Sequence, residues 1–123
     1  MITTLLLAAI GCASGPKTPV VDREIIRKVV FSNVQDVQKC YMQTIDRRPG
    51  AEGKLVAGWF IQPDGKTSEA RIVSADKRLE GIDECILLEI GTWVFPRPPN
   101  KEGVDVTYPF FFSENGRFGE SDE

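Results

Sequence analysis

The chain has 123 residues, a formal net charge of -3, three cysteines and no histidine. This length is enough for one small domain with one hydrophobic core. Lys and Arg are scattered along an acidic chain, which argues against nucleic-acid binding because that function needs a basic stripe. Without histidine, metal sites lose their commonest ligand and acid–base catalysis loses its usual residue. The composition therefore predicts no nucleic acid, metal or cofactor among the partners.

A short apolar run at residues 5–11 precedes the first cysteine, Cys12. It is too short to span a bilayer, which takes about 20 apolar residues, and it has the length of a secretory signal core. Small residues flank Cys12, and Ala9-Ile10-Gly11-Cys12 resembles the lipobox of a bacterial lipoprotein. We therefore expect a signal peptide at residues 1–11, and a lipidated Cys12 with a linker at residues 12–21. The alternative is a buried N-terminal segment of a cytosolic domain.

The other two cysteines, Cys40 and Cys85, are an even pair if Cys12 carries lipid. An exported protein can keep such a pair oxidised. Their spacing differs from C-x-x-C, so neither a thioredoxin-type redox motif nor a zinc knuckle is indicated.

An amphipathic pattern begins at Asp22, which can cap a helix. Apolar residues recur at spacings of three and four, with charged residues on the other side. The stripe consists of Ile26, Val29, Val30, Val34, Val37, Tyr41 and Ile45. It predicts one long helix packed on one face and ended by Arg48-Pro49-Gly50.

Two strands joined by a turn are predicted next. Side chains alternate in character over residues 54–61 and again over residues 69–74, and Pro63-Asp64-Gly65 is a turn signal because Pro presets φ and Gly accepts positive φ. One face of the hairpin would hold Leu55, Ala57, Trp59, Ile61, Ala70, Ile72 and Ser74. The opposite face would hold Val56, Gly58, Phe60, Glu69, Arg71 and Val73.

A second helix at about residues 81–93 and a third strand complete the pattern. In the strand "GVDVTYPFFF", the residues that share one face at period two are Val104, Val106, Tyr108, Phe110 and Phe112. The order helix, strand, strand, helix, strand predicts an α+β fold, with a three-stranded antiparallel or mixed sheet and two helices on one face. Residues 113–123 are polar and mostly acidic, and we expect them to form a disordered tail.

Taken in order, these motifs resemble the AgmX/PglI C-terminal domain family, which is similar to the TonB C-terminal domain. The motifs are Cys-Tyr at Cys40, the alternation and turn of "GKLVAGWFIQPDGKTSEARIVS", the cysteine of "IDECILLEIGTWVFPRP", and "VDVTYPFFF". The resemblance covers residues 22–112 and implies a non-catalytic domain of an envelope protein. Export and the family pattern together favour a structural Cys40–Cys85 disulfide, and two buried free thiols are the alternative.

No set of side chains stands out as catalytic. Four aromatic residues most simply belong to the core, because a ligand pocket would also need convergent polar groups: Trp59, Trp93, Phe95 and Tyr108. Three carboxylates most simply form a solvated helix face: Asp83, Glu84 and Glu89. No Ser has an evident activating partner, so we expect no enzyme activity; a hydrolase or redox enzyme would need a reactive Cys40 or Cys85.

The side of the sheet away from the helices is a candidate contact surface. If the helices cover one side, the residues that face the other are Val56, Phe60, Val73 and Phe111. Exposed apolar patches are more often contact surfaces than accidents. We expect an envelope protein or a second copy to bind there, and coverage by the linker or tail is the alternative.

These features together predict a lipid-anchored cell-envelope protein facing the periplasm. Ala13 rather than Asp follows Cys12, which favours the outer membrane over the inner membrane. The TonB-like domain would act as a protein-interaction or scaffold module. The alternative is an energy-transducing or transport-coupling component of a TonB-like or gliding-motility system. That role needs an anchor reaching an ion-driven motor, whereas residues 13–21 extend only about 30 Å.

Overall fold

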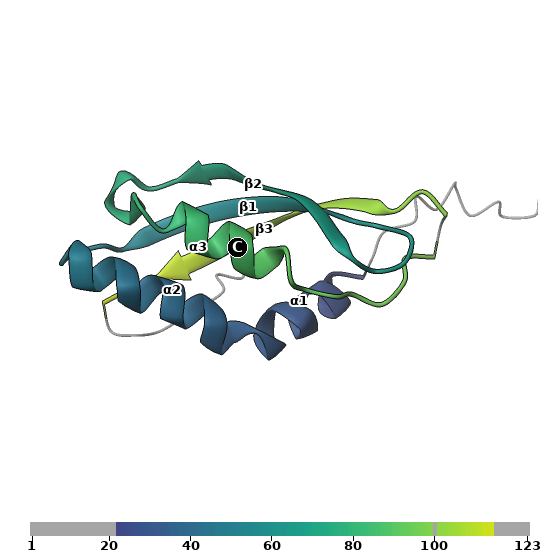
Figure 1. Ribbon diagram of the computed structural model, residues 1–123, viewed down its shortest axis with the longest axis horizontal. Helices are drawn as coiled ribbons and strands as arrows, with labels where there is room; N and C mark the ends of the chain where they lie inside the picture. The colour runs from purple at the N-terminus through teal and green to yellow at the C-terminus, as the bar shows by residue number, and fades with distance from the viewer. Residues whose placement is uncertain (1–21, 100, 115–123) are drawn as a thin grey trace, which may run out of the picture.

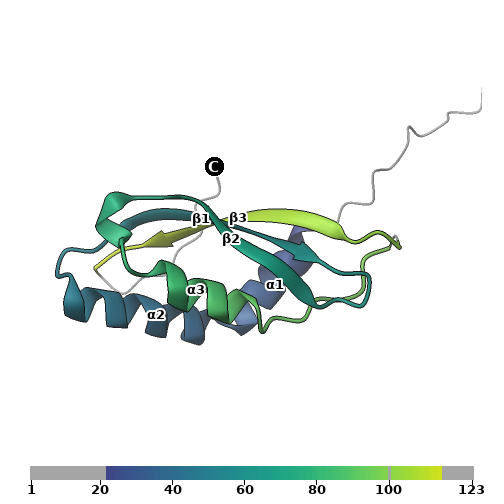
Figure 2. The same cartoon turned by 45° about the horizontal axis from the view of Figure 1, so that its top comes forward.

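The computed structural model describes residues 22–99 and 101–114, so the expected signal peptide, Cys12, the linker and residues 115–123 of the tail lie outside the described part. The elements follow the order α1 (Arg23–Ser32), α2 (Val34–Arg47), β1 (Gly53–Ile61), β2 (Thr67–Ala75), a short 3-10 helix (Lys77–Leu79), α3 (Asp83–Ile90) and β3 (Val104–Phe112). The three helices lie on one side of an open, three-stranded antiparallel sheet (Figures 1 and 2). This arrangement confirms the predicted α+β class.

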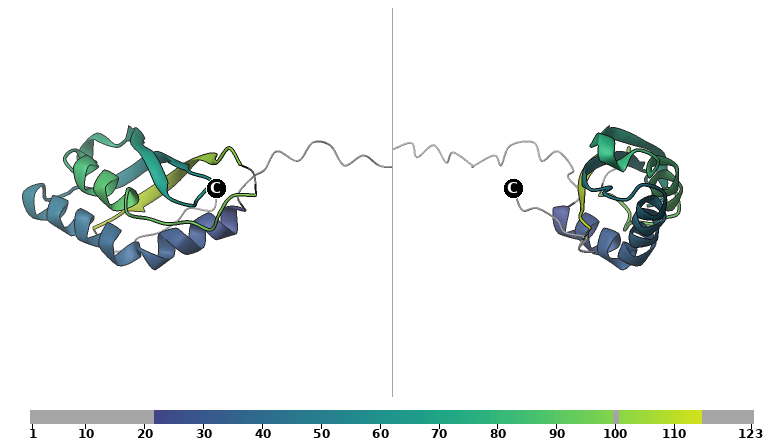
Figure 3. Two further views of the ribbon diagram at one scale, coloured as in Figure 1. Left: turned by 45° about the vertical axis from the view of Figure 1, so that its right-hand side comes forward. Right: turned by 90° about the vertical axis from the view of Figure 1, so that its left-hand side faces the viewer.

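The prediction of a single long first helix is wrong, because the chain bends at Asn33 and forms α1 and α2 (Figure 3, left). The Ser32 hydroxyl donates to the Lys28 carbonyl oxygen at 2.6 Å, and Asn33 Nδ2 donates to the Val29 carbonyl oxygen at 2.8 Å. Such side-chain bonds compete with the backbone ladder and bend helices. The described residues therefore contain three α-helices rather than the two expected.

The strand order is β2-β1-β3, with β1 in the centre. Its pairing with β3 is regular from Gly53↔Phe112 to Ile61↔Val104. Its pairing with β2 shifts twice, and the first shift leaves Val73 as an extra residue between Ile72 and Ser74. Ser74 consequently pairs with Val56, so the predicted alternation, which placed Ser74 on the same face as Ile72, fails at this bulge.

The core lies between the sheet and the helices. The inward side chains of β1 are fully buried: Leu55, Ala57, Trp59 and Ile61. Trp93, which follows α3, meets Trp59 edge to face with ring centroids 5.6 Å apart. Aromatic pairs in this geometry stabilise a core beyond the area they bury.

The segment after α3 is tied to the turn between β1 and β2. The Phe95 N–H donates to the Gly65 carbonyl oxygen at 2.8 Å, and the Thr67 hydroxyl donates to the Trp93 carbonyl oxygen at 2.7 Å. Gly65 has φ +90°, and a Cβ there would collide with the Phe95 carbonyl oxygen. The turn therefore requires glycine at this position, and α3 ends at Ile90 so that Trp93 and Phe95 can enter the core.

Candidate interaction surface

The sheet has an outer face, directed away from the helices, which is built from alternate residues of β1 and β3. Because the inward residues of β1 are buried, the intervening residues point outward. The outer face comprises Lys54, Val56, Gly58 and Phe60 of β1 and Asp105, Thr107, Pro109 and Phe111 of β3. On β2, Ser74 and Arg71 pair with outer-face residues of β1.

The four residues predicted for the contact surface all lie on the sheet, but they do not form one continuous apolar patch. Val56 pairs with Pro109, and Phe111 is the diagonal neighbour of Val56 on the same face. Phe60 lies four residues further along β1, which is roughly 13 Å away. Val56, Phe60 and Phe111 are half-buried, whereas Val73 is 54% exposed at the bulge.

An ion pair crosses the middle of the outer face and separates its two apolar parts. Arg71 Nη2 lies 2.8 Å from Asp105 Oδ2, so the guanidinium reaches from β2 over β1 to β3. The crossing passes over Gly58, where a Cβ would lie 2.9 Å from Arg71 Cζ. Periodicity in the sequence does not indicate this pair. Gly58 is the one signal for it, because a glycine inside a strand often marks close approach by another group.

The larger apolar part, formed by Val56, Pro109 and Phe111, has cations beside it. Lys54 Nζ lies 5.6 Å from the centroid of the Phe111 ring, within the range of a cation–π interaction. We call this group, with Lys54 and Arg71 at its margins, the Phe111 patch. Half-buried apolar side chains with charged margins are the composition of a small protein-contact surface.

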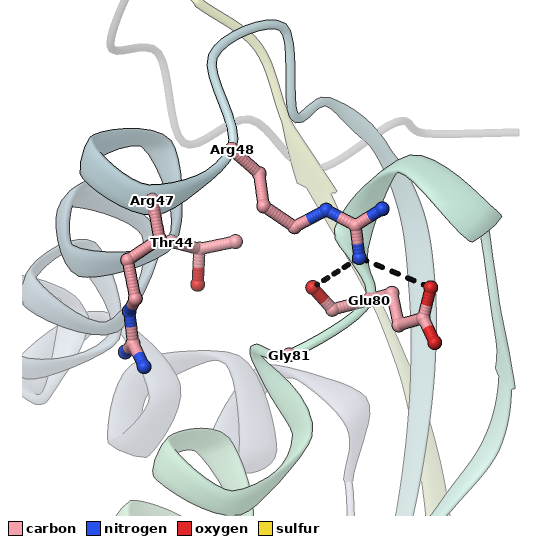
Figure 4. A pocket seen from close by; sticks show the side chains of 5 residues that line it. All are labelled: Thr44, Arg47, Arg48, Glu80 and Gly81. Carbon is pink, nitrogen blue, oxygen red and sulfur yellow. Dashed lines mark hydrogen bonds and ion pairs between the residues drawn. The ribbon is translucent and has the colours of Figure 1, made fainter.

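On the helix side of the molecule, the C-terminal end of α2 carries a charged cluster (Figure 4). Arg48 Nη1 donates to the Glu80 carbonyl oxygen at 3.2 Å and pairs with Glu80 Oε2 at 3.0 Å, while Arg47 points elsewhere. The hollow that they line with Thr44 and Gly81 holds about 60 Å³. That volume admits water molecules, whereas ligand sites usually need several hundred Å³.

A neighbouring hollow of about 440 Å³ is lined by Ala75, Asp76, Lys77, Glu80 and Asp83. Hydrogen bonds from the side chain and backbone of Arg78 lower the pKa of Asp76 below its ordinary value, and so does the positive charge of that guanidinium. Four of the five lining residues carry charges, and the predominantly apolar wall of a small-molecule site is missing from this lining. Within residues 22–99 and 101–114, no three His, Cys, Asp or Glu side chains are grouped so as to hold a metal ion.

Cys40 of α2 and Cys85 of α3 form a disulfide with their Cα atoms 5.6 Å apart. Cys40 is buried and Cys85 is half-buried, so the bond lies at the contact between the two helices. The candidate lipidation residue, Cys12, lies outside the described residues. In the part of the chain that the structure describes, no helix has both the length and the apolar character needed to cross a membrane.

The aromatic residues assigned to the core are there: Trp59, Trp93, Phe95 and Tyr108 are at most 3% exposed. Among the carboxylates assigned to a solvated helix face, Asp83 and Glu84 are exposed and Glu89 is half-buried. Comparison of the chain with protein-family models, with curated proteins and with solved structures gave no match.

Proposed function

We propose that this protein is a non-catalytic, lipid-anchored component of a bacterial cell envelope, whose TonB-like domain binds another protein through the Phe111 patch. The observation that carries the proposal is the asymmetry of the sheet. All three helices cover one side of it, while the other side presents Val56, Pro109 and Phe111 between charged side chains.

The composition of the patch supports contact with a protein. Aromatic residues and arginine are enriched in protein interfaces, whose apolar centre is surrounded by a polar rim. Phe111 would provide the central side chain, and Lys54 and the Arg71–Asp105 pair would provide the rim. A partner with apolar and acidic side chains fits these groups.

The anchor is tested by labelling cells with a fatty acid that can be traced. Label should appear on the protein and disappear in Cys12→Ala. Label retained in that variant, or absent from the parent protein, would remove the lipid anchor from the proposal.

The contact surface is tested by placing a photoreactive phenylalanine analogue at Phe111 and irradiating native envelopes. We expect a discrete crosslinked product, whose mass distinguishes a second copy from a different protein. The matched control carries the analogue at Leu88, a 68% exposed residue of α3 on the helix side. Val56→Asp, checked for folding by circular dichroism, should abolish the product from Phe111. Equal products from both positions, or none from Phe111, would rule out the Phe111 patch as the contact surface.

A further inference from the structure

The exposed part of α1 carries three cations and one carboxylate. Ile26 and Val30 are buried, whereas Arg23 and Lys28 are exposed and Arg27 is half-buried. At 3.6 residues per turn, Arg23 lies beside Val30 at the margin of the buried side, and Arg27, Glu24 and Lys28 follow around the exposed side. Phe31 is on that side too and is 44% exposed, with Arg27 Cζ 5.9 Å from its ring centroid. We call Arg23, Arg27, Lys28 and Phe31 the α1 basic face.

This concentration of positive charge contrasts with the rest of the chain. Residues 13–32 carry four basic and two acidic side chains, a net charge of +2, while residues 33–123 carry -5, and together they give the formal charge of -3. One acidic side chain lies on this helix beside the cations: Glu24 Oε1 is 3.6 Å from Arg27 Nη1. Neither Arg23 nor Lys28 forms an ion pair with another described residue. The guanidinium of Arg23 and the ammonium group of Lys28 are therefore available to an external anion.

The α1 basic face is also the part of the domain next to the proposed anchor. Only residues 13–21 separate Cys12 from Asp22, which caps α1 by accepting from the Glu24 N–H. The acidic tail begins at the other end of the molecule, where β3 ends beside the C-terminal end of α2 (Figure 1). There, Glu114 Oε1 is 3.8 Å from where a Cβ on Gly50 would lie.

We propose that the α1 basic face rests on the anionic lipid headgroups of the membrane that holds Cys12. The proposal rests on the lipid anchor proposed above. Arg and Lys attract anionic headgroups, and an exposed aromatic side chain can enter the interface between headgroups and acyl chains. A linker of nine residues keeps α1 within about 30 Å of the membrane, so a weak affinity suffices because the local lipid concentration is high.

The occupant of this face is a lipid surface rather than a protein because of position and charge together. Every other exposed large apolar side chain of the described residues lies further along the chain than Phe31: Met42, Val73, Leu88 and Val94. α1 is the first element after the linker, and its side chains carry a net charge of +2, opposite in sign to that of an anionic membrane.

The test uses the full chain with Cys12→Ser, which cannot be acylated, and vesicles of phosphatidylcholine with or without about 30% phosphatidylglycerol. We expect partition at millimolar lipid to favour the anionic vesicles and to weaken as salt rises to about 0.15 M. The double variant Arg23→Gln/Lys28→Gln should partition about tenfold less strongly. Its matched control, Lys77→Gln/Lys101→Gln, removes the same charge elsewhere and should change partition by less than about twofold. Phe31→Ser should weaken partition more than Leu88→Ser.

Equal partition into neutral and anionic vesicles, no partition into either, or equal losses for the two double variants would overturn the proposal. Circular dichroism of each variant establishes that it is folded. Because the protein tested carries no lipid, these outcomes do not depend on whether Cys12 is acylated in cells. Fatty-acid labelling tests that separately, so failure of the anchor and failure of the α1 basic face are distinguishable.

Discussion

Gly58 lies at the centre of β1, where the guanidinium of Arg71 crosses to reach Asp105. A Cβ at this position would be 3.0 Å from Arg71 Nη2, so Gly58→Ala displaces the end of the arginine side chain and weakens its ion pair with Asp105. The pair is partly exposed, and such pairs stabilise a fold by at most about 1 kcal/mol. Alanine is itself more favourable than glycine inside a strand by roughly 0.5–1 kcal/mol, so we expect Gly58→Ala to lower the free energy of unfolding by no more than about 0.5 kcal/mol, measured by urea denaturation.

The control for Gly58→Ala is the same substitution in an Arg71→Ala background. Without the guanidinium, alanine should be neutral or stabilising, because glycine inside a strand costs roughly 0.5–1 kcal/mol relative to alanine. The four proteins form a double-mutant cycle that isolates the coupling between the two positions. Equal losses in the two backgrounds would show that Arg71 is not what requires glycine at this position.

Tyr41 links α2 to the start of β1, since its buried hydroxyl donates to the Ala51 carbonyl oxygen at 2.6 Å. Burial raises the pKa of Tyr41 above its ordinary value of 10.0, and the negative charges of Glu114 and Glu52 raise it further. The unfolded chain therefore loses this proton first as pH rises. The contribution of protonated Tyr41 to the free energy of unfolding is therefore fully present below pH 10.0. It is lost as pH rises through 10.0 towards the pKa of the folded state.

Tyr41→Phe should lower the free energy of unfolding by about 1–3 kcal/mol at neutral pH, because the buried Ala51 carbonyl loses its donor. Between about pH 9 and pH 11, the variant should lose less stability than the parent protein, because it has no proton to release at this position. Urea denaturation at a series of pH values measures both effects. Parallel pH profiles for the two proteins would contradict the assignment of the raised pKa to Tyr41.

The contact between α2 and α3 depends on a covalent bond as well as on packing. Cys40 and Cys85 are 45 residues apart, and in the chain-entropy model closing such a loop stabilises the fold by about 4 kcal/mol. This is a large fraction of the 5–15 kcal/mol typical of whole domains. Cys40→Ala/Cys85→Ala should therefore lower the free energy of unfolding by about 4 kcal/mol.

Cys12→Ser is the control for the disulfide variant, because it removes a thiol without opening the loop and should leave stability unchanged. In protein that is not acylated, titration of the unfolded, unreduced chain should find one free thiol, that of Cys12. After reduction of the disulfide it should find three. A double variant as stable as the parent protein would show that the bond contributes little to the fold.

The sequence predicts the strands better than the helices, for a geometric reason. Side chains of a strand alternate strictly, so the inward residues of β1 and β3 were predictable. The bend at Asn33 was not predictable, because the apolar stripe continues across it from Val30 to Val37. The end of α1 is determined instead by local side-chain hydrogen bonds, such as the one from Asn33 to the Val29 carbonyl oxygen.

The outer face was predictable only in part. The positions of Val56, Phe60 and Phe111 on the outer face follow from the alternation of side chains along a strand. The position of Val73 depends on a β-bulge, which no residue in the sequence indicates. The Arg71–Asp105 pair joins residues 34 positions apart through the registers of two different strand pairs. The periodicity of one segment does not determine how strands are aligned with one another. The ion pair that divides the outer face could therefore be identified only from the structure.

For the whole molecule, β3 is the regular edge of the sheet, and among the described residues it pairs only with β1. The Asp76 N–H donates to the Lys54 carbonyl oxygen at 2.9 Å, so the backbone groups of Lys54 point towards β2. Because these directions alternate along a strand, those of Val56 also point towards β2. Its partner on the other side, Pro109, therefore has its backbone nitrogen directed away from β1, towards the open edge.

Proline at this position removes a donor from the open edge without removing one from the sheet. Exposed edges with regular donors and acceptors pair with other chains, and proline is one of the residues that prevents this. We expect Pro109→Val to leave the fold intact and to increase self-association, measured by analytical ultracentrifugation over a range of protein concentrations. Thr107→Val is the matched control, because it places valine two residues away on the same face without adding an N–H group. Association that rises equally in both variants would assign the effect to apolar surface rather than to the backbone donor, and unchanged association in Pro109→Val would show that proline does not protect this edge.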